Sequence, residues 1–513
     1  MSTIFSQCES LPKVELAQPE SKWIHSCGFR GPFGITASVE TFDEVLDWQE
    51  KRRALVQGYY RLIHPPRMQN FQARLEKKYP GRKAVFFASA ALARKEILDL
   101  MKIRGISGEI HEIAGIPEHL SGDVSILDLQ DTDADIQAGA ALCKNPDFAA
   151  ELHERNRRRG GALSARNVAW ILREADRTGP DPEAEKHAGE ILLELDQADH
   201  ALFYPSGMAA VTAVLEAAHQ PGRNRFLVMG NVYRDTHMLL EEMAWGTRDV
   251  RADFLDTHDL DALSENIRDK DVAAVFLETI TNPLIEVPDL PGIIQIAKRA
   301  GVPVLVDGTM ATPYNCRPLE WGADVVMHST SKYLSGNNAH GGGVVLTNSQ
   351  GWAELLKRDQ EQTQNRLSPL EFPGLVEGLK TFPERMERFN RNGEALANML
   401  RAHPAVKRVY FGNGTLPEWI TGLGSVVSCE LKDESQAALA RVFEAPMPGV
   451  VKAPSLGSDV TLFCPYVFLT YYDKSPEYLE HCHLPRHLLR FAVGCEPDFD
   501  PVMKGISEAL GTG

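Results

Sequence analysis

The stretch HSTSKYLSG, residues 328–336, places Lys332 among side chains that carry hydroxyl groups. It follows the apolar run ADVVM, which is typical of a buried strand. Ser329 and Ser331 stand on either side of Thr330 and are able to point the same way. A lysine at such a strand end is either solvated, as most lysines are, or reactive toward a carbonyl group. The neighbouring motifs decide between these two interpretations.

Two other apolar strands end in residues whose side chains or backbone groups could take part in binding or catalysis. VLVDGT leaves Asp307 at a strand end, where a carboxylate in a cleft favours a partner that is positive. YPSGMAA puts Ser206, Gly207 and Met208 at a turn into a helix, whose N–H groups and dipole form a cradle for phosphate. Ligand sites in open α/β sheets lie at the carboxyl ends of the strands, so we expect these residues to share a site with Lys332.

A phosphate cradle, a strand-end aspartate and a cleft lysine together match the needs of pyridoxal phosphate. The lysine forms a Schiff base with the aldehyde, and the aspartate keeps the pyridine nitrogen protonated, which makes the ring an electron sink. Tyr233, in GNVYRDT, is placed to stack on the ring. Each feature is common alone, but their conjunction predicts a pyridoxal 5'-phosphate site with Lys332, Tyr233 and Asp307 as catalytic residues.

The elements around these motifs predict an α/β fold. From about residue 200, apolar strands such as RFLVMG, AAVFLET and VPVLVDG alternate with helical stretches, which indicates a mostly parallel sheet covered on both faces. Later strands, such as VKRVYF, have less helix between them. We expect an extended N-terminal region over residues 1–185, a cofactor-binding domain over 186–374 and a smaller α+β domain over 375–513. Residues 1 to about 58 show little regular pattern and are expected to form an arm.

Composition narrows the class of partner. The 513 residues are too many for one hydrophobic core, and 54 basic against 70 acidic residues give a formal charge of −16. This charge disfavours nucleic acid and anionic membranes as partners. No apolar run is long enough to span a bilayer, and the eight cysteines are scattered, so a reduced, cytoplasmic protein is predicted. Cys482 lies between two histidines but has no second cluster nearby, and no metal site is predicted.

The chain from about residue 185 to 511 resembles the cysteine/methionine-metabolism family of fold-type-I pyridoxal-phosphate enzymes, such as cystathionine γ-synthase and the γ-lyases. Matching stretches include FYPSGMAAVTAVL, LETITNPLIEVPDL and LLRFAVGCEPDFD, and the match over residues 303–336 is highly specific. The resemblance implies that family's seven-stranded-type sheet between helices. It also implies a small amino-acid substrate and a homodimer or homotetramer with active sites at the subunit interface.

The resemblance also assigns roles residue by residue. Lys332 matches the Schiff-base lysine, Asp307 the pyridine partner and Tyr233 the stacking tyrosine. The positions that match cofactor contacts are Ser206, Gly207, Met208, Ser329 and Ser331 at the phosphate and Asn282 near the ring hydroxyl. Ser455 and Arg490 match the pair that grips the substrate α-carboxylate, which suits a bidentate arginine. Without the resemblance, a structural salt bridge is the preferred interpretation of Arg490.

The chain departs from the family ahead of the Ser-Gly-Met turn. The family has a Tyr-x-Arg arm there that reaches the phosphate of a neighbouring subunit. Arg61 in YYRLIHPP and Arg166 in GGALSARN are the two candidates for this arm. We expect Arg166 to contact the phosphate because it precedes the intact turn, although the tyrosine of the arm is missing there. The long front region looks most like the elongated, fungal-type cystathionine γ-synthase-like subgroup.

Other departures concern the front region and the substrate pocket. FFASAALA, around Ser89, echoes FYPSGMAA, which predicts that the N-terminal third contains a reduced copy of family elements without the lysine. Gly308 and Met310 replace the usual asparagine and aromatic residue, and we interpret both as packing changes. Asp459 stands near the expected substrate pocket and is a candidate for recognising a polar or cationic group.

These features predict γ-elimination or γ-replacement on an α-amino acid that bears a γ-leaving group. An alternative is a secondary-metabolism γ-lyase that expels an unusual group, such as halide from an unsaturated amino acid, to give an alkynyl amino acid. An alternative of another class is a non-catalytic regulatory relative, against which the intact Lys332, Asp307 and Ser206 argue. The motifs define the early steps better than the choice between elimination and replacement.

Overall fold

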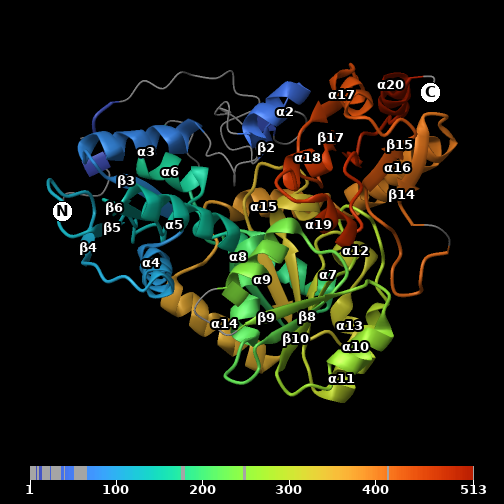
Figure 1. Cartoon of the computed structure of the whole chain (residues 1–513). Helices are drawn as coiled ribbons and strands as arrows, with labels where there is room; N and C mark the ends of the chain where they lie inside the picture. Colours follow the sequence, from blue (N-terminus) through green and yellow to red (C-terminus); the bar gives the residue numbers. More distant parts are fainter. Residues whose placement is uncertain are drawn as a thin grey trace.

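The computed structural model describes residues 7–8, 11–13, 23–24, 36–37, 39, 41–50, 66–174, 179–245, 250–412 and 415–511. These residues form a four-stranded, a seven-stranded and a five-stranded sheet, which follow one another along the chain. Figure 1 shows the four-stranded sheet on the left in blue and teal, and the five-stranded sheet on the right in orange and red, with the seven-stranded sheet between and below them. A short antiparallel pair, β1 (Trp23–Ile24) and β2 (Thr36–Ala37), is separate.

The seven-stranded sheet is the predicted α/β core. Its strands in spatial order are β7 (His200–Tyr204), β13 (Gly343–Thr347), β12 (Val325–Ser329), β11 (Val304–Asp307), β10 (Val272–Glu278), β8 (Arg225–Met229) and β9 (Arg251–Leu255). The strands from β12 to β9 are parallel, and β13 runs antiparallel to both of its neighbours. Side chains of β10 alternate between two apolar cores, one on each face of the sheet. The predicted mostly parallel sheet, covered on both faces, is confirmed.

Helices on both faces bury this sheet. Those that contribute to one core are α8 (Gly207–Ala218), α9 (Arg234–Trp245) and α14 (Gln350–Thr363). Those that contribute to the other are α7 (Ala184–Asp196), α10 (Leu260–Asn266), α11 (Leu290–Ala300), α13 (Pro318–Trp321) and α15 (Phe372–Lys380), while α12 (Thr312–Asn315) lies between core residues Ala311 and Cys316. Because the strands are parallel, their carboxyl ends gather at one edge, where a site is expected.

The five-stranded sheet belongs to the predicted smaller α+β region. Its spatial order is β14 (Val406–Tyr410), β15 (Val426–Leu431), β18 (Leu489–Ala492), β17 (Thr461–Pro465) and β16 (Val450–Lys452). Its helices are α16 (Phe382–Ala402), α17 (Gln436–Glu444), α18 (Tyr466–Thr470), α19 (Pro476–His481) and α20 (Asp500–Leu510). One apolar core runs from this region into the central sheet, so the loops of β16 and β18 are held firmly beside it.

The four-stranded sheet, called the front sheet below, was predicted only in part. Its spatial order is β3 (Lys83–Phe87), β6 (Gly139–Cys143), β5 (Val124–Asp128) and β4 (Ile110–Ala114). Its helices are α3 (Pro66–Lys78), α4 (Ala90–Arg104), α5 (Pro146–Arg159) and α6 (Ala165–Ile171). Sequence patterns indicated α3, α4 and β5. They did not indicate β6, because its sequence GAALC contains no β-branched or aromatic residue.

The expectation of an irregular arm over residues 1–58 is wrong at α2 (Phe42–Gln49), which packs on α17 and α18. Thr41 Oγ1 accepts from the Glu44 N–H at 3.2 Å, and Glu44 Oε2 accepts from the Thr41 N–H at 3.2 Å. This reciprocal pair is a capping box, which the sequence TFDE already contains.

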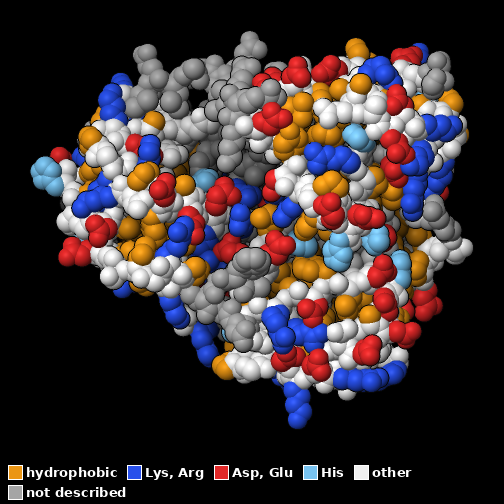
Figure 2. Space-filling model, viewed as in Figure 1, with side chains coloured by type: hydrophobic (Ala, Val, Ile, Leu, Met, Phe, Trp, Pro, Cys, Tyr) orange, Lys and Arg blue, Asp and Glu red, His pale blue; other side chains and the backbone are white. Residues whose placement is uncertain are grey.

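Within the described residues, no helix is long and apolar enough to cross a bilayer. Figure 2 shows acidic and basic side chains mixed over the visible face.

Candidate active site

Lys332 lies in a π-helical turn, η2 (Thr330–Leu334), directly after β12. Its backbone departs from helical geometry, with φ −97° and ψ −129°. Nζ donates a hydrogen bond to Oγ of Ser455 at 2.6 Å, and that hydroxyl donates to Oδ1 of Asn338 at 3.0 Å. Ser455 itself has a φ of 97°, a strained value for a residue with a side chain. The structure therefore brings Lys332 together with one of the two predicted substrate-binding residues.

Arg490, in β18, is the other predicted substrate-binding residue and is 4% exposed. Nη2 donates to the Ser455 carbonyl at 2.6 Å, and Nη1 donates to Oδ1 of Asn282 at 3.2 Å. The guanidinium also lies over the ring of Tyr466, 4.8 Å from its centroid. Its buried Nε–H has no hydrogen-bond partner, and no carboxylate of the described residues pairs with it. Because a buried cation without an anion is unfavourable, this geometry favours a negatively charged ligand over a structural salt bridge.

Asp307 ends β11 in register with Glu278, which ends the neighbouring strand β10. Oδ1 of Asp307 accepts from the Thr309 N–H at 2.9 Å. Burial raises the pKa of Asp307, and burial together with the nearby Asp307 raises the pKa of Glu278 well above its usual value. A cation at this edge of the sheet relieves the repulsion and keeps Asp307 ionised. The pair thus fits a protonated ring nitrogen.

The turn before α8 has the shape of an anion cradle. Ser206 caps the helix, and its Oγ accepts from the Ala209 N–H at 3.1 Å. The N–H groups of Gly207 and Met208 occupy the first helical positions, where no intrahelical partner exists. A Cβ added to Gly207 would lie 2.8 Å from Cβ of Ser329, so glycine lets the turn contact the end of β12. The cradle fits a phosphate group.

Two hydroxyl groups expected at the phosphate already have backbone partners. Oγ of Ser206 donates to the Gly160 carbonyl at 2.9 Å. Oγ of Ser331 donates to the Gly342 carbonyl at 3.2 Å and accepts from the N–H of the same residue at 3.0 Å. These bonds fix the shape of the cradle, and direct contact of either hydroxyl with the phosphate stays a prediction.

Arg166, at the start of α6, connects to the lysine turn through buried side chains. Its Nη1 lies 2.7 Å from Oε2 of Glu371, and that oxygen lies 3.3 Å from Nδ1 of His340. Nε2 of His340 lies 2.9 Å from Oγ1 of Thr330, the first residue of η2. Direct contact of Arg166 with the phosphate stays a prediction. The alternative, Arg61, lies outside the described residues.

Tyr233, just before α9, is held at both ends. Its N–H donates to Oε1 of Glu278 at 2.5 Å, and its hydroxyl donates to Oδ2 of Asp235 at 3.2 Å. Oδ1 of Asp235 lies 3.4 Å from Nη1 of Arg157, which comes from α5 beside the front sheet. Tyr233 is thus positioned by a strand-end acid and by an arginine from the N-terminal region. Its stacking on the cofactor ring stays a prediction.

The two departures beside Asp307 have packing explanations. A Cβ on Gly308 would lie 2.5 Å from Cε1 of His328, whose Nε2 lies 2.8 Å from Oδ2 of Asp196. Met310 is 4% exposed and belongs to the apolar core. A role for Asp459 in substrate recognition stays a prediction.

Comparison with known proteins identifies the source of this geometry. A family model described as "Cys/Met metabolism PLP-dependent enzyme" matches residues 183–511. The chain belongs to this family. It is accordingly a pyridoxal-phosphate-dependent enzyme of the lyase and transferase class. The residues around Lys332 fit that cofactor, because cradle, amine and acid lie at one edge of the sheet.

Three relatives of this Cys/Met metabolism enzyme each match just under two thirds of its length. Cystathionine gamma-lyase of Bacillus subtilis (strain 168) is 30% identical over 337 residues, which are 62% of this chain and 84% of that protein. Cystathionine gamma-synthase of Haemophilus influenzae is 30% identical over 331 residues, 63% of this chain and 83% of that one. The crystal structure of cystathionine gamma synthase from Xanthomonas oryzae pv. oryzae in complex with aminoacrylate and cysteine covers 65% of this chain and 86% of its own, with a TM-score of 0.60 and 28% identity.

Several residues of the site escaped sequence analysis. Glu278 had a readable signal, because it is an acidic residue at the end of the apolar strand VAAVFLE, and buried acids are rare without a partner or a role. Asn338, Tyr466 and Asp235 had none, because only the folded chain brings them to Ser455, Arg490 and Tyr233.

Glu371 links α6, α15 and the lysine turn, and its charge stabilises the fold. Burial alone raises the pKa of Glu371, but Arg166 and His340 outweigh burial and hold it at about 2, below the ordinary 4.5. The carboxylate therefore stabilises the protein above pH 4.5, and this contribution is lost as the pH falls toward 2. Glu371→Gln is expected to lower the free energy of unfolding by about 3 kcal/mol at pH 7 and by about 2 kcal/mol at pH ~3.5.

Urea denaturation at the two pH values measures this difference. Glu377→Gln, on the same helix with a side chain that is 73% exposed, is the control and should change the free energy by less than ~0.5 kcal/mol at either pH. An equal loss at both pH values for Glu371→Gln contradicts the charge-based explanation.

Proposed function

We propose that the chain catalyses γ-elimination or γ-replacement on an α-amino acid that carries a γ-leaving group. The observation that carries this proposal is the position of Arg490. It is buried without a carboxylate partner among the described residues, and it is bonded to Ser455, whose hydroxyl accepts from Lys332 Nζ. An α-carboxylate held there sets the rest of the amino acid beside the lysine amine. The family membership of residues 183–511 supports the reaction class.

Binding and orientation come from the edge of the five-stranded sheet. The fork of Arg490 offers paired N–H donors to a carboxylate, and the Ser455 hydroxyl adds a third donor when it turns from Asn338 to the carboxylate. Asn282 and Tyr466 hold the guanidinium in place. These contacts hold the substrate in a fixed orientation before any proton moves, which lowers the entropic part of the reaction barrier.

Proton transfer is assigned to Nζ of Lys332. The amine lies at the end of β12, and as a neutral base it takes the proton from the substrate α-carbon and later returns or relays it. When bound, pyridoxal phosphate supplies the aldehyde that captures the substrate amine and the ring that accepts electrons. Asp307 provides the negative charge that keeps the ring nitrogen protonated, while Glu278 anchors the backbone of Tyr233.

We also propose that the enzyme is cytoplasmic and forms homo-oligomers. The seven cysteines that the structure describes are buried and free, which supports a reducing compartment. Most soluble oligomers are closed, symmetric assemblies of identical chains, and a dimer or tetramer of whole chains is the form we expect.

A panel of γ-substituted amino acids tests the reaction, each incubated with and without cysteine. The panel includes homoserine esters, cystathionine and a halogenated unsaturated amino acid. Elimination releases a keto acid and ammonia from the saturated members, or halide and an alkynyl amino acid from the halogenated unsaturated one, whether or not cysteine is added. Replacement forms a thioether only with cysteine. We expect one of these products to form, with release of the γ-substituent. Bound cofactor without turnover of any member contradicts the proposal and favours a regulatory role.

A further inference from the structure

The front sheet repeats half of the central sheet. Strands β3, β6, β5 and β4 lie side by side in this order, as do β7, β13, β12 and β11. In both sets the first two pairings are antiparallel and the third is parallel. Below, residues 83–171 are called the front unit and residues 200–371 the cofactor unit.

The match extends to single residues at the phosphate turn. Two residues after its first strand, each unit has a serine with extended backbone that caps a helix, Ser89 before α4 and Ser206 before α8. Gly139 opens β6, and Gly343 opens β13. A Cβ added to Gly139 would lie 2.6 Å from the carbonyl oxygen of Ser89, and one on Gly343 would lie 2.4 Å from that of Ser206. The same close contact therefore shapes both turns.

The helices α5 and α14 correspond as well. Each begins three residues after its strand ends (146 − 143 and 350 − 347), and each has 14 residues. The next residue has a positive φ in both, 75° at Gly160 and 50° at Gln364. Strand, turn, helix and cap thus have equal lengths in the two units, which indicates an internal duplication rather than a chance likeness.

The front unit lacks the means for its own catalysis. Among its described residues there are no counterparts of β8, β9 and β10. Asp128 pairs with Gly139 at the end of β5, the position that Ser329 takes opposite Gly343. The following residues, 129–138, contain no lysine. The front unit is therefore a reduced copy without the reactive amine.

The two units contact each other through corresponding helices, because α4 corresponds to α8 and α5 corresponds to α14. Helix α5 packs on α8, and α4 packs on α14 (Figure 1). Ser206 donates to the carbonyl of Gly160 at 2.9 Å, and Ser89 donates to the carbonyl of Thr363 at 2.6 Å. Reciprocal contacts of this kind characterise the two-fold interface of a homodimer.

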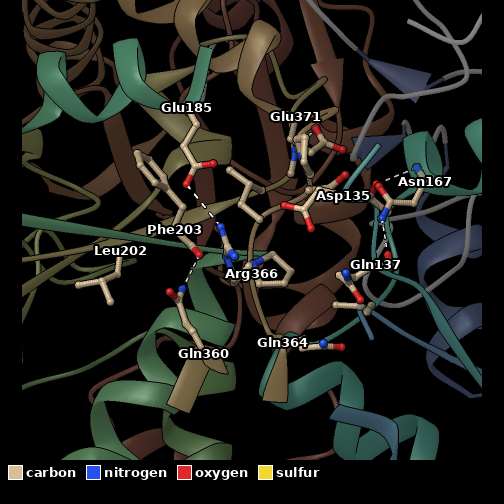
Figure 3. Close-up of a pocket in the computed structure, with 18 of the residues that line it drawn as sticks. Asp135, Gln137, Asn167, Glu185, Leu202, Phe203, Gln360, Gln364, Arg366 and Glu371 are labelled. Atoms are coloured by element: carbon tan, nitrogen blue, oxygen red, sulfur yellow. Dashed lines mark hydrogen bonds and ion pairs between the residues drawn. The ribbon is translucent and has the colours of Figure 1, made fainter. Parts of the chain in front are cut away.

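A cavity of about 480 Å³ lies at the centre of this interface (Figure 3). Part of its lining consists of residues at corresponding sequence positions of the two units: Ala88 with Pro205, Gln137 with Gly341, Ala162 with Arg366, Ser164 with Ser368 and Asn167 with Glu371. The first pair is 117 residues apart (205 − 88), as the capping serines are, and the other four are 204 apart (341 − 137). Five such pairs around one cavity fit an approximate two-fold axis that passes through it.

Buried charges hold the interface together. Arg155 of α5 contacts Glu242 of α9 at 2.6 Å, and Lys95 of α4 contacts Glu216 of α8 at 2.8 Å. Arg159, 5% exposed, contacts Glu96 of its own unit at 2.9 Å and also reaches Glu216. Breaking a buried pair leaves an uncompensated charge, so the two units do not separate easily.

We infer that the front unit is a reduced second copy of the cofactor unit which takes the place of a partner subunit and completes the cofactor site within the same chain. Its positioning residue is Arg157, 7% exposed, which lies 3.4 Å from Asp235 and through that carboxylate orients the Tyr233 hydroxyl. The role of Arg157 rests on the proposed placement of Tyr233 against the cofactor ring. Whole chains remain free to associate, but no second chain is needed for the site.

Substitution of Arg157 in the purified holoenzyme tests the positioning role. Arg157→Met is expected to weaken binding of pyridoxal phosphate about 10-fold, as loss of one bond to a charged group predicts. It should also change the circular dichroism that the protein induces in the cofactor band. Arg157→Lys should recover part of both. Arg158→Met is the control: both arginines lie on α5 and contact Glu154, but the second contact of Arg158 is Glu242, whereas that of Arg157 is Asp235.

Combination with Tyr233→Phe locates the path of this effect. If Arg157 acts through the Tyr233 hydroxyl, Arg157→Met has no further effect in the Tyr233→Phe background. An unchanged cofactor affinity and dichroism in Arg157→Met, or equal changes in Arg158→Met, overturn the positioning role. Additive effects of the two substitutions overturn the path through Tyr233. These readouts measure cofactor binding, so they stand even if the proposed reaction is wrong.

Mixed oligomers test completion within one chain. A Cβ on Gly160 would lie 2.2 Å from Oγ of Ser206, so Gly160→Val displaces the front unit from the cradle. Co-expressed Gly160→Val and Lys332→Ala chains, purified through two tags, contain no intact site if completion is internal. We expect activity no higher than the sum of the variants, and one cofactor per wild-type chain.

Activity above that sum, or two cofactors per chain, overturns the inference. Failure to form mixed oligomers because the active enzyme is a monomer supports it directly. If Gly160→Val does not fold, Arg157→Met replaces it in the same experiment.

Discussion

Lys332→Ala is expected to lower kcat/KM by ~10⁴-fold or more, because in the proposed mechanism it removes both the covalent attachment point and the base. Nζ of Lys332 is the amine at the carboxyl end of β12, and it donates to Ser455 at 2.6 Å. Ser455 keeps its bond to Asn338 in the variant, so the substrate-binding loop should retain its shape. The loss should therefore appear in kcat far more than in substrate affinity.

Visible absorbance and steady-state kinetics measure this outcome. The wild type should show the absorbance band of lysine-linked cofactor. Lys332→Ala should lack this band but should still bind the cofactor, as measured by equilibrium dialysis. Lys380→Ala is the matched control, since Lys380 is 61% exposed and pairs with Glu377. Added methylamine should restore part of the turnover if the missing group is a base. A variant that keeps the band and the wild-type rate shows that another lysine holds the cofactor.

The central fold and the main site were predictable because their signals are local. Strands β8, β10, β11 and β12 are continuous apolar runs between helices, a pattern that only a sheet covered on both faces explains. Asp307, Lys332 and the Ser206 turn each follow such a strand. Since parallel strands end at one edge, their order along the chain already implied that they meet.

The approach of Arg490 to Ser455 and Asn282 had no local signal. The three residues are separated by long stretches of chain, and the pairing follows from the docking of the five-stranded sheet on the central one. The family resemblance supplied the Ser455 and Arg490 assignment before the structure was known. The bonds among them explain physically why these residue types occur there.

The sequence did not predict the front sheet as a whole, because the patterns of its strands are weak. Its strand β6 reads GAALC, and β4 reads IHEIA, which is only half-buried and interrupted by charge. The similarity of the Ser89 turn to the Ser206 turn was visible in the sequence. The packing of α5 on α8 and of α4 on α14 was not.

Arg490→Met is expected to lower kcat/KM by about 100-fold, the equivalent of ~3 kcal/mol, because the substrate carboxylate loses the buried charged partner that we propose for it. Arg490→Lys should recover only part of this, since an ammonium cannot offer the paired donors of a guanidinium. The loss should lie mainly in KM, because Arg490 holds the carboxylate equally before and during the proton transfer.

A carboxamide analogue of the best substrate makes the test specific. The wild type should prefer the carboxylate substrate by about 100-fold, whereas Arg490→Met should treat the two almost alike, because the discriminating charge is gone. Arg408→Met is the matched control: Arg408 lies 4.7 Å from the ring centroid of Tyr410, much as Arg490 lies over Tyr466, but Arg408 is exposed. If Arg490→Met keeps the wild-type preference for the carboxylate, the anion is bound elsewhere, and the buried guanidinium must serve the packing of β18 against Tyr466 alone.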